Sequence, residues 1–286
     1  MNSSTTVAAA RARDEHRGPV RFIERPGGRI SYEDGGGAGP LVVCVPGMGD
    51  LRGQYRFLAP RLAALGHRVV TMDLRGHGDS SVGFRDASAA AVGGDMVALL
   101  DTLGARDAVV VGNSMAAAAA VWAAAERPGT IRGLALLGPF VRDTPVSFGV
   151  RLAMRFAFLR PWGPAAWASY YRSLHVTVKP ADLDAYAARL AANLREPGRL
   201  ETLRSMMFAS KAACEARLDE VKAPAVVVMG TKDPDFADPA AEARWVAGRV
   251  DGQLVLVEGA GHYPHVEQPD AVAEAIVRLV ARRRDA

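Results

Sequence analysis

The 286-residue chain is poor in cysteine and lysine, and it lacks long apolar runs. Its two cysteines, Cys44 and Cys214, are too few for a disulfide framework, so we expect reduced thiols in the core. No apolar run is long enough to span a membrane. The first residues lack the apolar region of a signal peptide, and Asp14 and Glu15 argue against a transit peptide. These absences predict a cytoplasmic protein with no membrane partner and a disordered N-terminus at residues 1–18.

Lysine is scarce beside arginine, at 4 residues against 31, and the formal net charge is +4. Basic residues form no dense run outside residues 282–284, so we expect no nucleic-acid partner. The acidic residues, histidines and cysteines lack metal-ligand spacing, and the glycine-rich loops lack the ending of a phosphate loop. We therefore expect no metal and no cofactor, but a small-molecule substrate. The oligomeric state is left open, with a homodimer as a candidate.

Apolar, β-branched segments alternate with helical patterns along most of the chain. Strands are expected at 41–45, 67–72, 108–111, 131–137, 225–229 and 253–257. Helices are expected at 55–65, 87–103, 115–126, 239–247 and 270–281. This rhythm predicts an α/β fold with a mostly parallel, twisted sheet and helices on both faces. Two further short strands, at 20–22 and 29–32, are expected to pair as a hairpin.

The rhythm stops between residues 139 and 215, where helical stretches without a clear strand are expected. We predict a core domain formed by residues 19–138 and 216–286, with 139–215 inserted as a helical cap. This insertion holds 10 of the 19 aromatic residues of the chain. Several of them would line an apolar substrate pocket beneath the cap. The residues expected to bind substrate are Phe140, Phe148, Phe156, Trp162, Trp167, Tyr170 and Phe208.

The segment 112–116, GNSMA, leaves room for only a sharp turn between the strand at 108–111 and an alanine-rich helix. Ser114 lies at the tip of this turn, where a strained backbone would expose its hydroxyl above the end of the sheet. Small residues at Gly112 and Ala116 would avoid a clash across the turn. A serine that only caps the following helix is the alternative interpretation.

Two groups that could activate Ser114 follow later strands. Asp233 follows the strand at 225–229 and His262 follows the strand at 253–257, which places both at the carboxyl edge of the sheet. His262 would accept the serine proton, and Asp233 would orient the imidazole. Asp235 remains an alternative acid because its loop is long, and Asp143 remains another because it follows the strand at 131–137.

The glycine-rich loop after the strand at 41–45 is expected to complete the site. The backbone amide of Met48 in this loop and that of Met115 after the nucleophile would hold an oxyanion. His77 is expected to pack beneath the site. His265 is expected at a surface turn, with a second histidine of the pocket as the alternative.

Five motifs occur in order along the chain: VPGMG at 45–49, MDLRGHGDSS at 72–81, GNSMA at 112–116, GTKD at 230–233 and GAGHYP at 259–264. Together they resemble the α/β-hydrolase superfamily, and more narrowly its branch of capped bacterial serine esterases, non-haem haloperoxidases and C–C hydrolases. The sequence departs from the family pattern at Pro46-Gly47, where His-Gly is common, and at Ala116, where glycine is usual.

The resemblance implies a serine hydrolase that cleaves an ester, thioester or related acyl bond through an acyl-enzyme. Its substrate is expected to be a medium-sized apolar molecule. The alternative is a protein of the same fold that does not hydrolyse: an acyltransferase, cyclase or C–C lyase of small-molecule biosynthesis, or a small-molecule binding protein.

Overall fold

The computed structural model describes residues 18–143 and 147–281, and within them eight strands form one sheet. The expected disordered segment lies outside the described residues, except for residue 18. The sheet order is β1-β2-β4-β3-β5-β6-β7-β8, antiparallel between β1, β2 and β4 and parallel elsewhere. The strands are β1 (Val20–Arg25), β2 (Gly28–Asp34), β3 (Leu41–Val45), β4 (Arg68–Met72), β5 (Ala108–Asn113), β6 (Ile131–Leu137), β7 (Ala225–Gly230) and β8 (Gln253–Val257).

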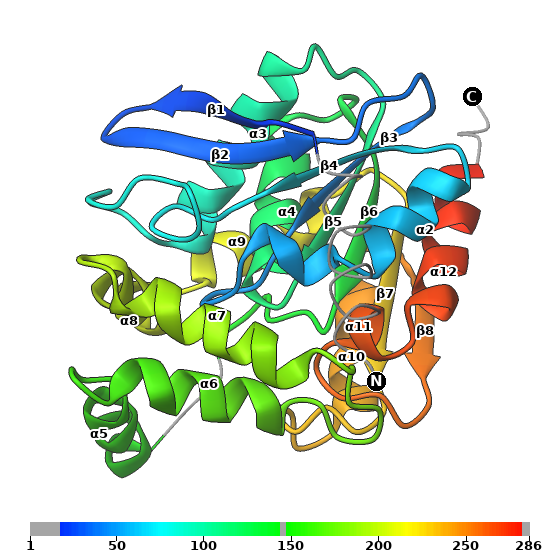
Figure 1. The fold of residues 1–286 in the computed structure, drawn as a ribbon. Coiled ribbons are helices and arrows are strands. Elements are labelled where there is room, and N and C mark those ends of the chain that lie inside the picture. The colour runs from blue at the N-terminus through cyan, green and yellow to red at the C-terminus, as the bar shows by residue number, and fades with distance from the viewer. Residues whose placement is uncertain (1–17, 144–146, 282–286) are drawn as a thin grey trace, which may run out of the picture.

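Alternate residues of the central strands face opposite sides of the sheet, and both sides are covered by helices (Figure 1). Val43 and Val110 pack with α3 (Ala89–Thr102), α4 (Met115–Glu126) and α10 (Pro239–Arg249). On the other side, residues such as Val42 and Val109 pack with α2 (Leu58–Ala64) and α12 (Pro269–Ala281). The predicted mostly parallel α/β sheet with helices on both faces is therefore confirmed.

After β6 the chain forms four helices of 10 to 13 residues, which Figure 1 shows grouped at one end of the sheet. They are α5 (Phe148–Ala157), α6 (Gly163–Ser173), α7 (Leu183–Arg195) and α8 (Arg199–Phe208). We call these four helices the helical insertion. Trp167 on α6 donates from Nε1 to the carbonyl of Gly49 at 2.9 Å, and Tyr186 on α7 donates to Asp50 at 2.6 Å. The helical insertion is therefore attached to the loop that follows β3.

Several element boundaries differ from those expected. The helix predicted to start at residue 55 consists of η1 (Arg52–Tyr55) and α2. After α8, a short α9 (Ala212–Glu215) and η2 (Leu218–Glu220) precede β7, and α11 (Pro264–Glu267) precedes α12. Cys214 of α9 packs in the cluster on the α3 and α4 side of the sheet, because the chain has already returned to the core there.

Both cysteines are buried and unpaired, as expected. Among the helices of the described residues, none combines the length and apolar character needed to cross a bilayer.

Candidate active site

Ser114 occupies a strained backbone position between β5 and α4. Its φ of 57° and ψ of −124° are rare for a residue with a side chain, which marks a tight and over-determined turn. A Cβ atom added at Gly112 would lie 2.4 Å from the carbonyl oxygen of Ala116. The turn therefore requires glycine at 112, whereas the methyl group of Ala116 is accommodated and fully buried. The sharp turn predicted at this segment is present.

His262 and Asp233 lie together at the carboxyl ends of β7 and β8. Nδ1 of His262 is 2.7 Å from Oδ2 of Asp233, and both residues are buried. Asp235 is more distant, with Oδ2 at 3.8 Å from the same nitrogen, and its Oδ1 accepts a hydrogen bond of 2.6 Å from Tyr170. Asp143 instead accepts hydrogen bonds from Ser210 and Lys211. Of the three candidate acids, Asp233 therefore has the geometry that orients the imidazole.

The electrostatics around His262 favour its protonated form. Burial by itself would lower the pKa of the imidazole, but the charge and hydrogen bond of Asp233, with the charge of Asp235, outweigh burial and raise the pKa to about 9. Burial has the opposite effect on a carboxyl group and raises the pKa of Asp235. The site can therefore stabilise an imidazolium, the species formed when histidine accepts a proton from serine.

The loop after β3 lies directly against Ser114, because β3 and β5 are paired with Val45 opposite Gly112. In this loop the N–H of Gly47 donates to Gln54, and the N–H of Gly49 donates to His77. Among the described residues, no acceptor bonds to the N–H of Met48. The N–H of Met115 belongs to the first turn of α4, where helical N–H groups have no intrahelical partner. Both amides are available to a ligand oxygen.

Gln54 is a fully buried side chain that sequence reasoning did not single out. Its Oε1 accepts from Gly47 at 3.2 Å, and its Nε2 donates to Oδ1 of Asn113 at 2.6 Å. Asn113 in turn donates to the carbonyl oxygens of Leu137 and His262. These hydrogen bonds connect the loop after β3, the turn at Ser114 and the loop after β8 that carries His262. Because glutamine is mostly found at protein surfaces, nothing in the sequence signals that Gln54 has such a role.

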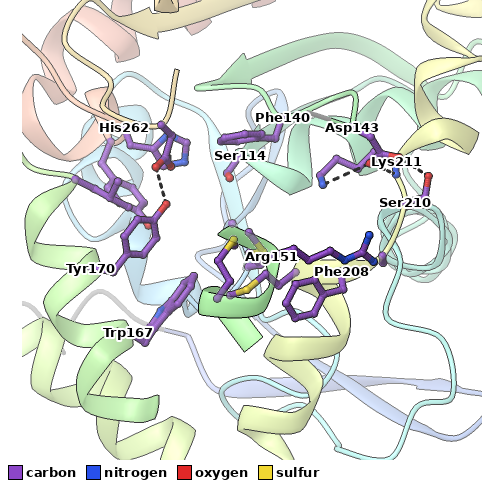
Figure 2. Close-up of a pocket in the computed structure, with 18 residues that line it drawn as sticks. Ser114, Phe140, Asp143, Arg151, Trp167, Tyr170, Phe208, Ser210, Lys211 and His262 are labelled. Atoms are coloured by element: carbon purple, nitrogen blue, oxygen red, sulfur yellow. Dashed lines mark hydrogen bonds and ion pairs between the residues drawn. The ribbon is translucent and has the colours of Figure 1, made fainter. Parts of the chain in front are cut away.

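Ser114 and His262 line one pocket of about 480 Å³, a size suited to a small molecule (Figure 2). Phe140, Trp167, Tyr170 and Phe208 of the predicted substrate-binding residues line it as well.

The other three predicted substrate-binding residues, Phe148, Phe156 and Trp162, do not line this pocket, so that prediction is corrected. They are 81%, 58% and 53% exposed, respectively. For Phe148 and Phe156 the physical reason is the orientation of α5, which turns Arg151 and Met154, one helical turn apart, toward the pocket. Trp162 precedes α6 and instead donates from Nε1 to the carbonyl of Phe156 at 2.9 Å. Sequence reasoning also missed Leu174, Met207, Lys211 and Tyr263 as lining residues. No periodic signal distinguishes them from ordinary helix and loop residues.

Comparison with known proteins identifies the family of this chain. A sequence model of the Alpha/beta hydrolase family matches residues 42–275, most of the chain. This chain belongs to the α/β-hydrolase family. The hydrolase is 28% identical over 240 residues to a pimeloyl-[acyl-carrier protein] methyl ester esterase of Neisseria meningitidis, covering 81% of this chain and 89% of the relative. It is also 28% identical over 279 residues to a dihydrolipoyllysine-residue acetyltransferase component of the acetoin cleaving system of Pseudomonas putida, covering 94% and 71%.

Among solved structures, a bromoperoxidase from Bacillus anthracis shares the fold with a TM-score of 0.80 at 17% identity, covering 92% of this hydrolase and 100% of that chain. The esterase relative agrees with the branch of the family indicated by the motifs, and the structural neighbour shows the shared fold.

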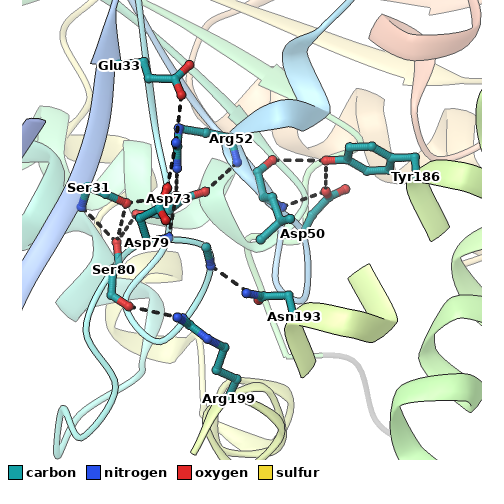
Figure 3. Close-up of polar contacts among 12 residues, drawn as sticks. Ser31, Glu33, Asp50, Arg52, Asp73, Asp79, Ser80, Tyr186, Asn193 and Arg199 are labelled. Carbon is teal, nitrogen blue, oxygen red and sulfur yellow. Dashed lines mark hydrogen bonds and ion pairs between the residues drawn. The ribbon is translucent and has the colours of Figure 1, made fainter. Parts of the chain in front are cut away.

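A network of ion pairs around Arg52 anchors η1, the helix that follows the loop after β3 (Figure 3). Arg52 pairs with the fully buried Asp73, and its guanidinium also lies 2.7 Å from Glu33 and 2.7 Å from Asp79. Asp73 additionally accepts from the backbone N–H of Arg52 at 2.7 Å and from the hydroxyl of Ser31 at 2.9 Å. The network fixes the start of η1, which carries Gln54.

Replacing Arg52 with methionine should destabilise the hydrolase by about 3–5 kcal/mol, because it leaves the buried Asp73 charge without its cation. Urea unfolding measures the change. The control is Arg127→Met, which removes an exposed pair with Asp101 and should cost no more than about 1 kcal/mol. Equal losses in the two variants would contradict a special role for the buried pair.

The remaining histidines differ in how well they were predicted. His77 is buried beneath the site, as expected, and its Nε2 accepts a hydrogen bond from the N–H of Gly49 in the loop after β3. His265 was predicted at a surface turn, but this is wrong. The residue is fully buried, as are all four residues of the short helix α11, and its ring stacks on that of Tyr55 with 5.1 Å between the ring centroids.

Within the described residues, one group has the composition of a metal site: the ligand atoms of Asp233, Asp235 and His262 lie within 4.8 Å of one another. Nδ1 of this histidine is already engaged by Asp233.

Proposed function

We propose that this hydrolase is a serine esterase that cleaves an ester, thioester or related acyl bond of a medium-sized small molecule through an acyl-enzyme. One observation carries the proposal: Ser114 projects from a strained turn into the pocket that it shares with His262, whose Nδ1 is held by Asp233 at 2.7 Å. The name of the esterase relative from Neisseria meningitidis supports the same class of reaction.

In the proposed reaction, Oγ of Ser114 attacks the acyl carbon while Nε2 of His262 accepts its proton. The oxyanion that forms would accept hydrogen bonds from the backbone amides of Met48 and Met115. The protonated His262 then donates its proton to the departing alcohol. Water, deprotonated by the same nitrogen, next attacks the acyl-enzyme and releases the acid. Throughout, Asp233 keeps the Nδ1 proton in place and stabilises the imidazolium.

Product analysis tests the reaction class. Incubation with p-nitrophenyl butyrate should yield butyrate and p-nitrophenol in equal amounts, with water as the acceptor of the acyl group. The name of the relative from Pseudomonas putida favours acyl transfer as a second candidate. A competing thiol or alcohol in the assay distinguishes the two, because a transferase would form the new ester or thioester at the expense of the free acid.

The pH dependence of activity should reflect the raised pKa of His262. A general base must be neutral to accept a proton, and the pKa of this imidazole is about 9. The value of kcat/KM should therefore rise through neutral pH and level off only above pH 9, as measured with p-nitrophenyl butyrate after correction for spontaneous hydrolysis. A profile that is flat from neutral to alkaline pH would contradict this assignment.

Activity should also increase with acyl chain length until the pocket is full. Each methylene buried against residues such as Met154 and Met207 should contribute about 0.8 kcal/mol of binding. We expect kcat/KM to rise from p-nitrophenyl acetate toward medium-chain esters. Met154→Ala should reduce this dependence, whereas Leu152→Ala, an exposed residue of the same helix, should leave it unchanged. Equal activity on all chain lengths would argue against an acyl pocket here.

A further inference from the structure

The pocket has two chemically different ends (Figure 2). Ser114, His262 and Tyr170 lie at one end, and Arg151, Lys211, Asp143 and Ser210 gather at the other. The proposed ester cleavage uses none of the second group. The end near Arg151 and Lys211 therefore requires its own explanation.

The arginines of the insertion segment differ in whether they are already neutralised. Arg142, Arg160 and Arg172 pair with Glu242, Glu201 and Asp184. Arg151 has no carboxylate within ion-pair distance among the described residues. Its guanidinium lies 5.8 Å from the centre of the Phe208 ring, and both residues line the pocket. Its charge is therefore free to meet a ligand.

Lys211 is a cation that the protein itself compensates poorly. Its side chain is only 13% exposed, and its Nζ is 3.9 Å from Oδ1 of Asp143. The carboxylate of Asp143 already accepts one hydrogen bond of 2.5 Å from the hydroxyl of Ser210 and another of 2.8 Å from the backbone N–H of Lys211. Burial lowers the pKa of the Lys211 ammonium, which indicates that this partner offsets desolvation only in part. An additional anion would complete its coordination.

We propose that the natural substrate of this pocket is an ester carrying one carboxylate, remote from the bond that is cleaved, and that Lys211 and Arg151 bind this carboxylate. Two positive charges and the single negative charge of Asp143 leave one net positive charge at this end, which a monoanion neutralises. Lysine and arginine both form charge-assisted hydrogen bonds with carboxylates. The pocket lining also includes apolar residues such as Met48 and Met207, which suit the body of such a molecule.

The inference rests on the proposed function for its reacting end and names the substrate class. Two kinds of ester satisfy it: the half-ester of a dicarboxylic acid, with the carboxylate on the acyl part, and the acyl ester of a hydroxy acid, with the carboxylate on the alcohol. Paired substrates distinguish them. One pair is mono-p-nitrophenyl adipate and p-nitrophenyl hexanoate, and the other is 4-butyryloxybenzoate and its methyl ester.

The readout is the ratio of kcat/KM for the charged substrate to that for its neutral partner. In the wild type we expect a ratio of about ten or more in one of the two pairs, expressed mainly in KM. Lys211→Met and Arg151→Met should each reduce that ratio. Lys222→Met removes the same charge from an exposed position outside the pocket and should keep the wild-type ratio. Ratios near one in both pairs, or equal ratios in Lys211→Met and Lys222→Met, would overturn the proposal.

A binding measurement keeps this proposal separate from the esterase proposal. By calorimetry, the Ser114→Ala variant should bind monomethyl adipate about ten-fold more tightly than methyl hexanoate, and adding Lys211→Met should abolish the difference. If this difference is found but the wild type cleaves neither ester, the carboxylate site stands and the esterase proposal fails. If the esters are cleaved but neither the binding nor the rate depends on the carboxylate, the esterase proposal stands and this inference fails.

Discussion

A Ser114→Ala variant should lose about 10⁶ in kcat for p-nitrophenyl butyrate, the loss found when the nucleophile of a serine hydrolase is removed. No other hydroxyl occupies the turn between β5 and α4, so no side chain could replace Oγ at that position. The variant should remain folded, because the bonds recorded for Ser114 are made by its backbone, with Leu137, Ala117 and Phe140. Steady-state kinetics and thermal unfolding measure the two expectations.

The matched control is Ser169→Ala, which removes an exposed hydroxyl from α6 and should keep full activity. A fluorophosphonate probe should label the wild type and Ser169→Ala, but not Ser114→Ala. Turnover by Ser114→Ala at a rate comparable to that of the wild type would exclude the serine mechanism. If Ser114→Ala were no longer labelled but still turned over the substrate, the serine mechanism would be excluded as well.

Asp233→Asn should reduce kcat by about 10⁴, because an amide of the same shape holds the wrong tautomer of the histidine. It should also lower the pKa of His262, since the carboxylate is the main group that raises it against burial. The rise of kcat/KM with pH should therefore shift to lower pH in this variant. Both changes can be measured in one series of pH–rate profiles.

Asp235→Asn and Asp143→Asn are the controls. Asp235 lies 3.8 Å from Nδ1 of His262 and is bonded to Tyr170, so its loss should cost far less than that of Asp233. Asp143 bonds to Ser210 and Lys211 at the other end of the pocket and should not affect the tautomer. A larger loss of kcat in either control than in Asp233→Asn would reassign the orienting acid.

The turn at Ser114 was predictable because its cause is local. The clash that forbids a side chain at Gly112 involves Ala116, only four residues away, so the steric requirement is written in one short segment. The carboxyl-edge positions of Asp233 and His262 were predictable for a related reason. Residues that follow parallel strands reach the same edge of a sheet, whatever the lengths of the helices between them.

The aromatic residues of the helical insertion were only partly predictable. Composition indicates that such residues pack against something, but it does not say which way a helix is turned. The rotation of α5 turns Arg151 and Met154 to the pocket and leaves Phe148 and Phe156 exposed. No periodicity within the helix reveals this rotation.

The residues alone thus establish the parallel α/β sheet, the strained serine turn and the order in which serine, acid and histidine follow their strands. Short-range sterics and strand direction are enough to impose these features. Tertiary structure decides which carboxylate meets His262, how Gln54 connects three loops, and that Lys211 and Arg151 line the same end of the pocket. Each of these depends on distances of a few ångströms between segments far apart in the chain, which only the packing of the whole molecule sets.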